Sequence, residues 1–287
     1  MTAPEIYEVY AIRYATRQGQ RRDHFVGGDP HDAAMPMDYF VWLLRNKNRT
    51  IVVDTGFHAS MATKRKRDYL RSPKEGLALL GVDASTVQDV IITHMHYDHV
   101  LWHPDLGDVP RWASAGTVEA ITSRRQELLE PLVGDIPEDL IALAGHLVPI
   151  SGPVLDWRGP RAVIHEHDAH ALHHIAVEIP DLGLLIAGDM LSDVELPMPD
   201  SADQTLTTYR GGLLSLAAVV ERVDRVIPGH GRVGRDVRER YEQDLAYLDD
   251  VDLTGRSADV RIPMDGNVEL HAENLARSAF AGARDSS

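Results

Sequence analysis

The sequence predicts an α/β fold in which two β-sheets are stacked and covered on the outside by helices. Stretches rich in β-branched and aromatic residues are followed by stretches of helical character, and this order occurs twice along the 287 residues. The chain is 44% apolar, which is enough for a large core, and layered domains of this length are often single. We therefore expect one domain over residues 1–287, with a disordered tail over 279–287.

The individual elements follow from local pattern and from glycine and proline positions. Apolar and β-branched runs predict strands at 6–15, 38–44, 50–53, 87–93, 111–115, 162–166, 175–179, 184–187 and 225–227. Helical character is found at 59–80, 117–145 and 212–222, and the middle helix is interrupted by Pro131 and Pro137. The basic run Lys64-Arg65-Lys66-Arg67 is expected on a solvated helix face.

Composition excludes several classes of partner. With 29 basic and 44 acidic residues, the net charge of −15 argues against nucleic acid or an anionic membrane surface and favours a small-molecule substrate. The N-terminus lacks a basic segment followed by an apolar run, and no apolar stretch approaches eighteen residues. We expect a cytoplasmic protein, with a homodimer as the assembly to test.

A dense group of histidines points to metal chemistry. The chain has no cysteine, so any metal must be held by imidazole and carboxylate. Residues 94–99 contain three histidines and one aspartate directly after an apolar strand. His94 and His96 alternate and can face one side, while Asp98 and His99 enter a turn and can reach a second ion. A polar surface loop with chance histidines is disfavoured, because the preceding strand would bury this pattern.

The pattern His94-x-His96-x-Asp98-His99 resembles the signature of the metallo-β-lactamase superfamily. The resemblance extends over about residues 38–232 and implies a four-layer αββα sandwich. Two further segments match it: Leu185-Ile186-Ala187-Gly188-Asp189 and Val226-Ile227-Pro228-Gly229-His230-Gly231. By this resemblance the first metal is held by His94, His96 and His170, the second by Asp98, His99 and His230, and Asp189 bridges the two.

Two parts of the implied site lie outside the three matching segments. The segment around His170 matches the family pattern only in degraded form, so His165 and His167 remain alternatives, and His173 and His174 are expected to line the pocket or the surface. The element Val53-Asp54-Thr55-Gly56 resembles a strand end whose aspartate supports the metal loop by hydrogen bonds instead of binding metal.

The implied reaction is hydrolysis on two divalent ions, most simply zinc, with iron, manganese or cobalt also compatible with these ligands. A metal-bridging hydroxide would attack a carbonyl, Asp189 would hold the ions together, and Asp98 would pass a proton to the leaving group. Segments 27–32, 37–43 and 53–57 resemble N-acyl-homoserine-lactone lactonases, so the expected enzyme opens a lactone or carboxylic ester. Those lactonases carry a tyrosine where this chain has Ser192, and Tyr97, Tyr209 or His173 are candidates to replace it.

Two other functions remain open on the sequence. A thioester hydrolase of the glyoxalase II kind would use the same metals, but it normally has a basic helical region near its carboxyl end, and the segment after residue 232 is acidic. A metal-binding scaffold or sensor without turnover is the alternative from another class.

Overall fold

The computed structural model describes residues 7–17, 37–100, 104–129, 146–199, 204–264 and 267–278. Its contacts divide the chain into two units. The first unit contains Met1–Arg17, Asp38–Glu166 and Ile175–Leu182, and the second contains Gln18–Met37, His167–His174 and Gly183–Ser287. The single domain stays a prediction, and the tail over 279–287 lies outside the described residues.

The first unit is built on a seven-stranded sheet. Its strand order is β4-β1-β2-β3-β5-β6-β7. The strands are β1 (Glu8–Arg17), β2 (Met37–Arg45), β3 (Thr50–Val53), β4 (Asp68–Tyr69), β5 (Asp89–Ile91), β6 (Arg111–Ser114) and β7 (Val148–Ile150). β1 pairs with β4 and β2 with β3 in antiparallel fashion, whereas β3, β5, β6 and β7 run parallel. The sheet is therefore mixed, and its parallel strands, from β3 to β7, lie together at one end of the strand order.

The parallel pair β3 and β5 positions the first group of predicted site residues. Val53 is in register with Ile91, so both strands end at the same edge of the sheet. Asp54 follows β3 directly and its backbone N–H donates to the Ile91 carbonyl at 2.8 Å. The two strands are almost completely buried, as expected for parallel strands in the interior of a sheet. Asp54 and the chain that leaves β5 therefore lie together.

The expected helix over 59–80 is wrong. The structure instead has α1 (Ala59–Lys64), the short strand β4 and α2 (Pro73–Leu79). Lys66 adopts a positive φ of 54°, which ends helical geometry after α1. Ser72 and Glu75 form a reciprocal capping box with Pro73 in the first turn, which begins a new helix. The basic residues 65–67 thus follow a helix end and do not form a helix face.

The rest of the first unit agrees with the sequence analysis where it is described, except that β7 was not expected. β8 (Val163–His167) and β9 (His174–Ile179), whose terminal histidines are assigned to the second unit, match the expected strands. The helical region expected over 117–145 begins as α3 (Ala115–Ser123) and α4 (Arg125–Leu129), and residues 130–145 lie outside the described part of the chain. Short 3₁₀ turns occupy Ala84–Thr86, Pro104–Leu106 and Pro180–Leu182.

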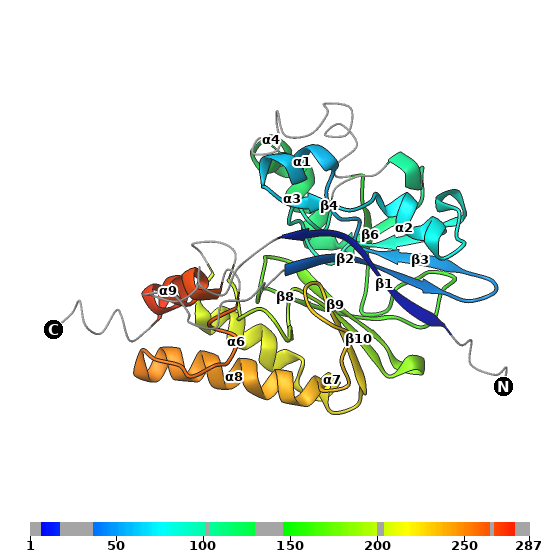
Figure 1. The fold of residues 1–287 in the computed structure, drawn as a ribbon. Helices are drawn as coiled ribbons and strands as arrows, with labels where there is room; N and C mark the ends of the chain where they lie inside the picture. The colour runs from blue at the N-terminus through cyan, green and yellow to red at the C-terminus, as the bar shows by residue number, and fades with distance from the viewer. Residues whose placement is uncertain are drawn as a thin grey trace. The chain divides into compact units, whose positions relative to one another are not determined.

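The second unit contains two parallel strands, β10 (Leu184–Gly188) and β11 (Arg225–Pro228). Helices α6 (Leu206–Ser215) and α7 (Ala217–Val220) lie between them in the chain and replace the single helix expected over 212–222. The unit continues with α8 (Val237–Thr254), which packs along α6, and α9 (Asn267–Arg277) (Figure 1). None of the described helices is long and apolar enough to cross a membrane. Because β10 and β11 are parallel, the residues that follow them share one edge.

Candidate metal centre

The loop over residues 94–99 lies in the first unit, immediately after β5. His94 is buried, and its ring atom Nδ1 lies 3.0 Å from the Thr93 hydroxyl. Its other ring nitrogen, Nε2, lies 3.0 Å from Nδ1 of His96. Thr93 thus orients the His94 ring so that Nε2 faces the same point as a nitrogen of His96. This arrangement is typical of two imidazoles that share an ion, since the outward nitrogen of a metal ligand is normally hydrogen bonded.

Asp98 and His99 form a second pair in the same loop, and both are buried. His99 Nδ1 lies 2.8 Å from Asp54 Oδ2, which leaves its Nε2 at 3.9 Å from Asp98 Oδ2. Ligand atoms of a tetrahedral zinc ion, each about 2.0–2.2 Å from the metal, are about 3.3–3.6 Å apart. The separation in this pair is close to that range, so a small closure would let both atoms bind one ion.

Asp54 supports the whole loop, as the sequence analysis expected. Its Oδ1 accepts the backbone N–H of Thr93 at 2.9 Å, and its Oδ2 accepts the Thr93 hydroxyl at 2.9 Å. The residue has a positive φ of 57°, an uncommon conformation for aspartate that turns its carboxylate back toward the loop. Gly56 is required nearby, because an added Cβ would lie 2.8 Å from the Tyr14 ring. Tyr14 in turn donates its hydroxyl to the Asp98 carbonyl.

The predicted ligands of the second unit converge on Asp189, the residue that follows β10. Asp189 Oδ2 lies 3.5 Å from His170 Nε2 and 3.5 Å from His230 Nε2. His170 is oriented by the Met198 carbonyl, which lies 2.7 Å from its Nδ1. One carboxylate oxygen therefore stands between a histidine assigned to the first metal and a histidine assigned to the second. This is the position that a bridging carboxylate needs.

The histidines that competed with His170 have other partners. His165 Nε2 lies 2.9 Å from the buried carboxylate of Glu178. His167 accepts the backbone N–H of Ala169 on its Nδ1 and therefore caps a turn. These contacts favour His170, although the ligand itself stays a prediction.

Glu195 was missed by the sequence analysis. In the second unit, ligand atoms of Asp189, Glu195 and His230 all lie within 4.8 Å of one another. No motif marks this glutamate, because it lies on an irregular loop six residues beyond Asp189. The only sequence signal for Glu195 is that it is an acidic residue shortly after the Gly188-Asp189 pair. Asp193 has the same property but does not belong to the group of Asp189, Glu195 and His230.

Ser192 explains how Glu195 reaches that position. Its hydroxyl donates to the His230 carbonyl at 2.8 Å and accepts the backbone N–H groups of Val194 and Glu195 at 3.1 and 3.0 Å. The side chain is buried, so it fixes the loop instead of facing a ligand. Tyr209 is one of the candidates to replace the missing tyrosine. Burial raises its pKa well above the usual value, so this phenol stays neutral.

The donor set of each unit fits divalent metal. All donors are imidazole nitrogens or carboxylate oxygens, which suit zinc and similar ions. Within each unit, the distances between neighbouring donor atoms are 3.0–3.9 Å, which brackets the spacing expected around one ion. Of the remaining histidines, His58 caps α1 by accepting the Ser60 backbone N–H, whereas His103 and the segment 27–32 lie outside the described residues.

Comparisons with known proteins agree with these observations. The family model described as "Metallo-beta-lactamase superfamily" matches residues 35–230 of this chain. A metallo-beta-lactamase family protein from Thermus thermophilus superposes with a TM-score of 0.59 at 19% identity, covering 96% of this chain and 94% of that one. A quorum-quenching N-acyl homoserine lactone lactonase gives a TM-score of 0.57 at 15% identity, covering 80% and 94%. The metallo-beta-lactamase FIM-1 from Pseudomonas aeruginosa in its mono-zinc form superposes with a TM-score of 0.52 at 18% sequence identity, covering 85% of this chain and 95% of that one.

The mixed sheet, the flanking helices and the imidazole and carboxylate donors of the two units define a hydrolase with an α/β sandwich fold and side chains suited to metal binding. The chain belongs to the metallo-β-lactamase superfamily, because the family match spans well over half of its length. The predicted fold class is therefore confirmed. The low sequence identities to the solved structures support the fold and leave the substrate to be argued from the residues.

Proposed function

We propose that this chain is a metal-dependent hydrolase that opens a lactone or carboxylic ester of a small molecule at a centre of two divalent ions, with zinc as the first candidate. The observation that carries the proposal is the position of Asp189, whose Oδ2 lies at 3.5 Å from both His170 and His230. A buried carboxylate at the end of an apolar strand needs a compensating charge, and two cations supply it.

Each ligand group has an assigned place in this centre. His94 and His96, with His170, would hold the first ion, and Asp98, His99 and His230 would hold the second. When bound, two such ions lower the pKa of a shared water toward 7 and polarise the carbonyl of the substrate. The chain then needs no serine or cysteine nucleophile.

The protein's own groups orient this chemistry. Thr93 and Asp54 fix the rings of His94 and His99, and the Met198 carbonyl fixes His170. Asp98 is the group assigned to carry a proton to the leaving oxygen, since its carboxylate is buried next to His99. Glu195 adds a further negative charge beside Asp189, which favours a cationic centre at this place.

Ester and lactone substrates are favoured over thioesters by the C-terminal part of the chain. In α8 the acidic side chains outnumber the basic ones, so this helix does not provide the basic region that a glyoxalase II-type enzyme uses. The resemblance of segments 37–43 and 53–57 to lactonases, together with the fold shared with a homoserine lactone lactonase, supports lactone opening as the first choice. A scaffold without turnover is the competing function.

The test combines metal content with a substrate panel. The purified protein is expected to contain close to two metal equivalents per chain and to hydrolyse lactones or aryl esters faster than thioesters and β-lactams. Asp189→Asn keeps the shape of the side chain but removes its charge. Turnover should therefore fall by more than roughly 10–100-fold, which is the usual loss when only the hydrogen-bond partner of a metal ligand is removed. The urea midpoint of the metal-free protein should change little.

Two results would overturn the proposal. Normal turnover by Asp189→Asn with both metals bound would remove the bridging role. A protein that binds two metals but turns over no lactone, ester or thioester would be a scaffold or sensor.

A further inference from the structure

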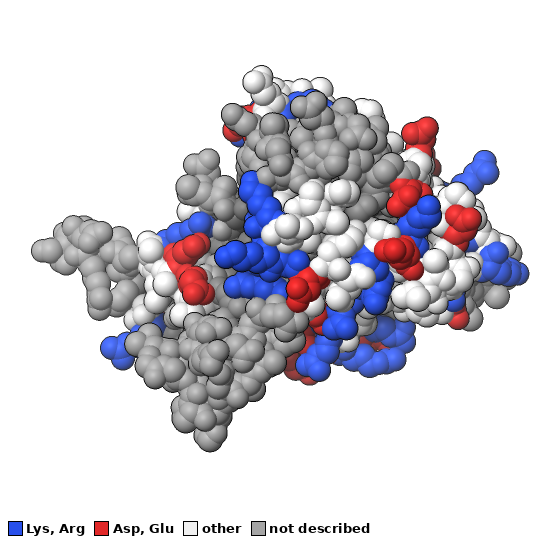
Figure 2. All heavy atoms as spheres, turned by 45° about the horizontal axis from the view of Figure 1, so that its top comes forward, with Lys and Arg blue, Asp and Glu red and all other residues white. Residues whose placement is uncertain are grey.

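A group of basic residues stands beside the metal loop of the first unit. Arg65, Lys66 and Arg67 follow the end of α1, and within the described part of the chain none of them forms an ion pair with a carboxylate. This is unusual in a chain with 44 acidic residues and a net charge of −15. Lysine and arginine side chains also gather on the face shown in Figure 2, in which the top of Figure 1 is turned toward the viewer.

The two arginines are held in place by aromatic rings. The Arg65 guanidinium lies over the Tyr97 ring, 3.8 Å from its centre, and the Arg67 guanidinium lies 5.8 Å from the centre of the Tyr39 ring. Arg67 also donates to the Arg65 carbonyl at 2.8 Å. Tyr97 itself packs on Phe57. The guanidinium groups are therefore ordered before any ligand arrives.

Their hydrogen-bonding capacity is only partly used. A guanidinium stacked on a ring directs its N–H donors sideways, in its own plane. Arg65 uses Nε toward the Met61 sulfur at 3.2 Å, and no hydrogen bond within the described residues uses its two terminal nitrogens. Arg67 has a buried Nε without a hydrogen-bond partner in the described part of the chain. Two neighbouring arginines with donors to spare match the planar oxygen pair of a carboxylate or a phosphate.

The location connects this group to the proposed reaction. Tyr97, which carries the Arg65 guanidinium on its ring, lies in the chain between the proposed ligands His96 and Asp98. We propose that Arg65 and Arg67 bind an anionic oxygen group of the substrate, a carboxylate or a phosphate, beside the bond that is cleaved. The inference rests on the proposed hydrolytic function and narrows its substrate to acidic lactones or esters. A long polyanion is disfavoured by the overall negative charge.

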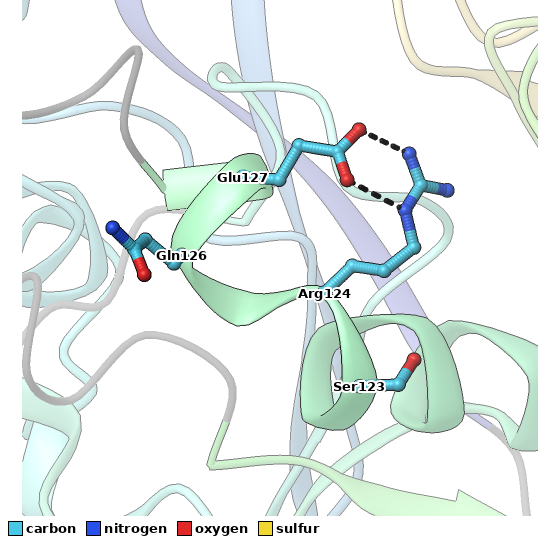
Figure 3. A pocket seen from close by; sticks show the side chains of 4 residues that line it. All are labelled: Ser123, Arg124, Gln126 and Glu127. Carbon is cyan, nitrogen blue, oxygen red and sulfur yellow. Dashed lines mark hydrogen bonds and ion pairs between the residues drawn. The ribbon is translucent and has the colours of Figure 1, made fainter.

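The shallow pocket in Figure 3 provides the matched control. It is lined by Ser123, Arg124, Gln126 and Glu127. Arg124 is paired there with Glu127 through two hydrogen bonds, one of them 2.9 Å from Nε to Oε2. Like Arg65, Arg124 is an exposed arginine of the first unit that follows a helix end. Its charge is already satisfied, so its removal should not affect an anionic substrate.

The first experiment compares matched substrates on the metal-loaded enzyme. The measured quantity is the kcat/KM for the 4-nitrophenyl monoester of glutaric acid divided by the kcat/KM for neutral 4-nitrophenyl valerate. This ratio is compared in wild type, Arg65→Gln, Arg65→Gln/Arg67→Gln and Arg124→Gln. A hydrogen bond to a charged group contributes enough for about a 10–100-fold effect. We expect the ratio to fall about tenfold or more in the double variant, to fall in part in Arg65→Gln, and to stay unchanged in Arg124→Gln. A phosphate-bearing ester of the same length distinguishes the two anions.

The second experiment measures binding without turnover. Titration calorimetry with glutarate and with butyrate isolates the contribution of the second carboxylate, which should be weakened in Arg65→Gln, disappear in Arg65→Gln/Arg67→Gln and persist in Arg124→Gln. Because Arg65 is exposed, its variant should fold even if the double variant does not. Equal substrate ratios and equal glutarate binding in wild type and Arg65→Gln would overturn the inference while the hydrolase stands. Tight glutarate binding that depends on Arg65, in a protein that cleaves no ester, would instead refute the proposed function alone.

Discussion

The two units support their proposed metal ligands in different ways. In the first unit the ligands are contiguous, and one side-chain carboxylate, that of Asp54, orients both the loop backbone and the ring of His99. In the second unit the ligands are dispersed and so are their supports: the Met198 carbonyl orients His170, and the Ser192 hydroxyl holds the backbone carbonyl of His230. An aspartate in a recognisable motif can be identified from the sequence, whereas a backbone carbonyl or an isolated serine carries no such signal.

The loop that carries Glu195 shows how the second unit compensates for this difference. Buried Arg261 donates to the carbonyls of Ser192 and Glu195 at 3.0 and 2.9 Å and is paired with Asp244 and Asp259. The loop is thus held by a side chain that lies far away in the sequence. Substitution of a supporting residue should therefore affect the nearby ligands directly in the first unit. In the second unit it should affect the ligands by changing the loop that carries Glu195.

Among the residues that support the ligands, the largest effect is expected at Asp54. Its two oxygens accept different donors, Oδ1 from the backbone of Thr93 and Oδ2 from His99. Asparagine has one acceptor oxygen, so Asp54→Asn must turn an amide N–H toward one of these donors. We expect metal affinity to fall about 10–100-fold, as measured by competition with a chromophoric chelator.

Asp89→Asn is the matched control for this prediction. Asp89 is buried in β5 and also uses both oxygens, for Trp112 Nε1 at 2.9 Å and for Arg49. It lies at the opposite end of the strand from the metal loop. This variant should lower the free energy of unfolding of the metal-free protein and leave metal affinity unchanged. Equal losses of affinity in both variants would show that Asp54 acts through general stability and not through His99.

The same contrast explains what the sequence could predict. The strand that leads into residues 94–99 follows from an apolar run, and the support of the loop by Asp54 follows from the family resemblance. The structure confirms both. Helix boundaries between 59 and 80 were wrong, because the positive φ of Lys66 and the capping box of Ser72 are local features within a stretch of overall helical character. Glu195 and the arginines beside Tyr97 depend on loop geometry, which no periodicity encodes.

An intermediate effect is expected at Ser192, where lactonases of similar appearance have a tyrosine. The side chain is 3% exposed, and a Cβ on Gly231 would lie 3.2 Å from its hydroxyl oxygen, so there is no space for a phenol. Ser192→Tyr should therefore destabilise the protein by about 1–3 kcal/mol in urea unfolding and should not raise kcat/KM for homoserine lactones. Ser192→Ala removes the shared partner of three backbone groups and should cost about 1–3 kcal/mol. A more active Ser192→Tyr with unchanged stability would mean that this loop opens toward the substrate.

The smallest effect is expected at Asp193, which joins the loop after β10 to the chain after His230. Burial alone would raise the pKa of Asp193, but hydrogen bonds from the backbone N–H and the guanidinium of Arg232, at 2.8 and 2.9 Å, hold it below its usual value. A carboxyl with a lowered folded-state pKa stabilises the fold above its unfolded-state pKa, near 3.9, and loses this contribution as the pH falls through the lower folded value.

Arg232 is exposed, so solvent screens its pairing with Asp193 and limits the effect of Asp193→Asn to under about 1 kcal/mol at pH 7. The difference between wild type and variant in the free energy of unfolding should be present at pH 7 and pH 5 and should shrink by pH 3. Urea unfolding at these three pH values measures it, with Arg238→Gln, which breaks the exposed pair of Arg238 with Glu221, as the control. A difference that grew toward pH 3 would mean that the folded-state pKa of Asp193 is raised, and that the Arg232 contact does not offset its burial.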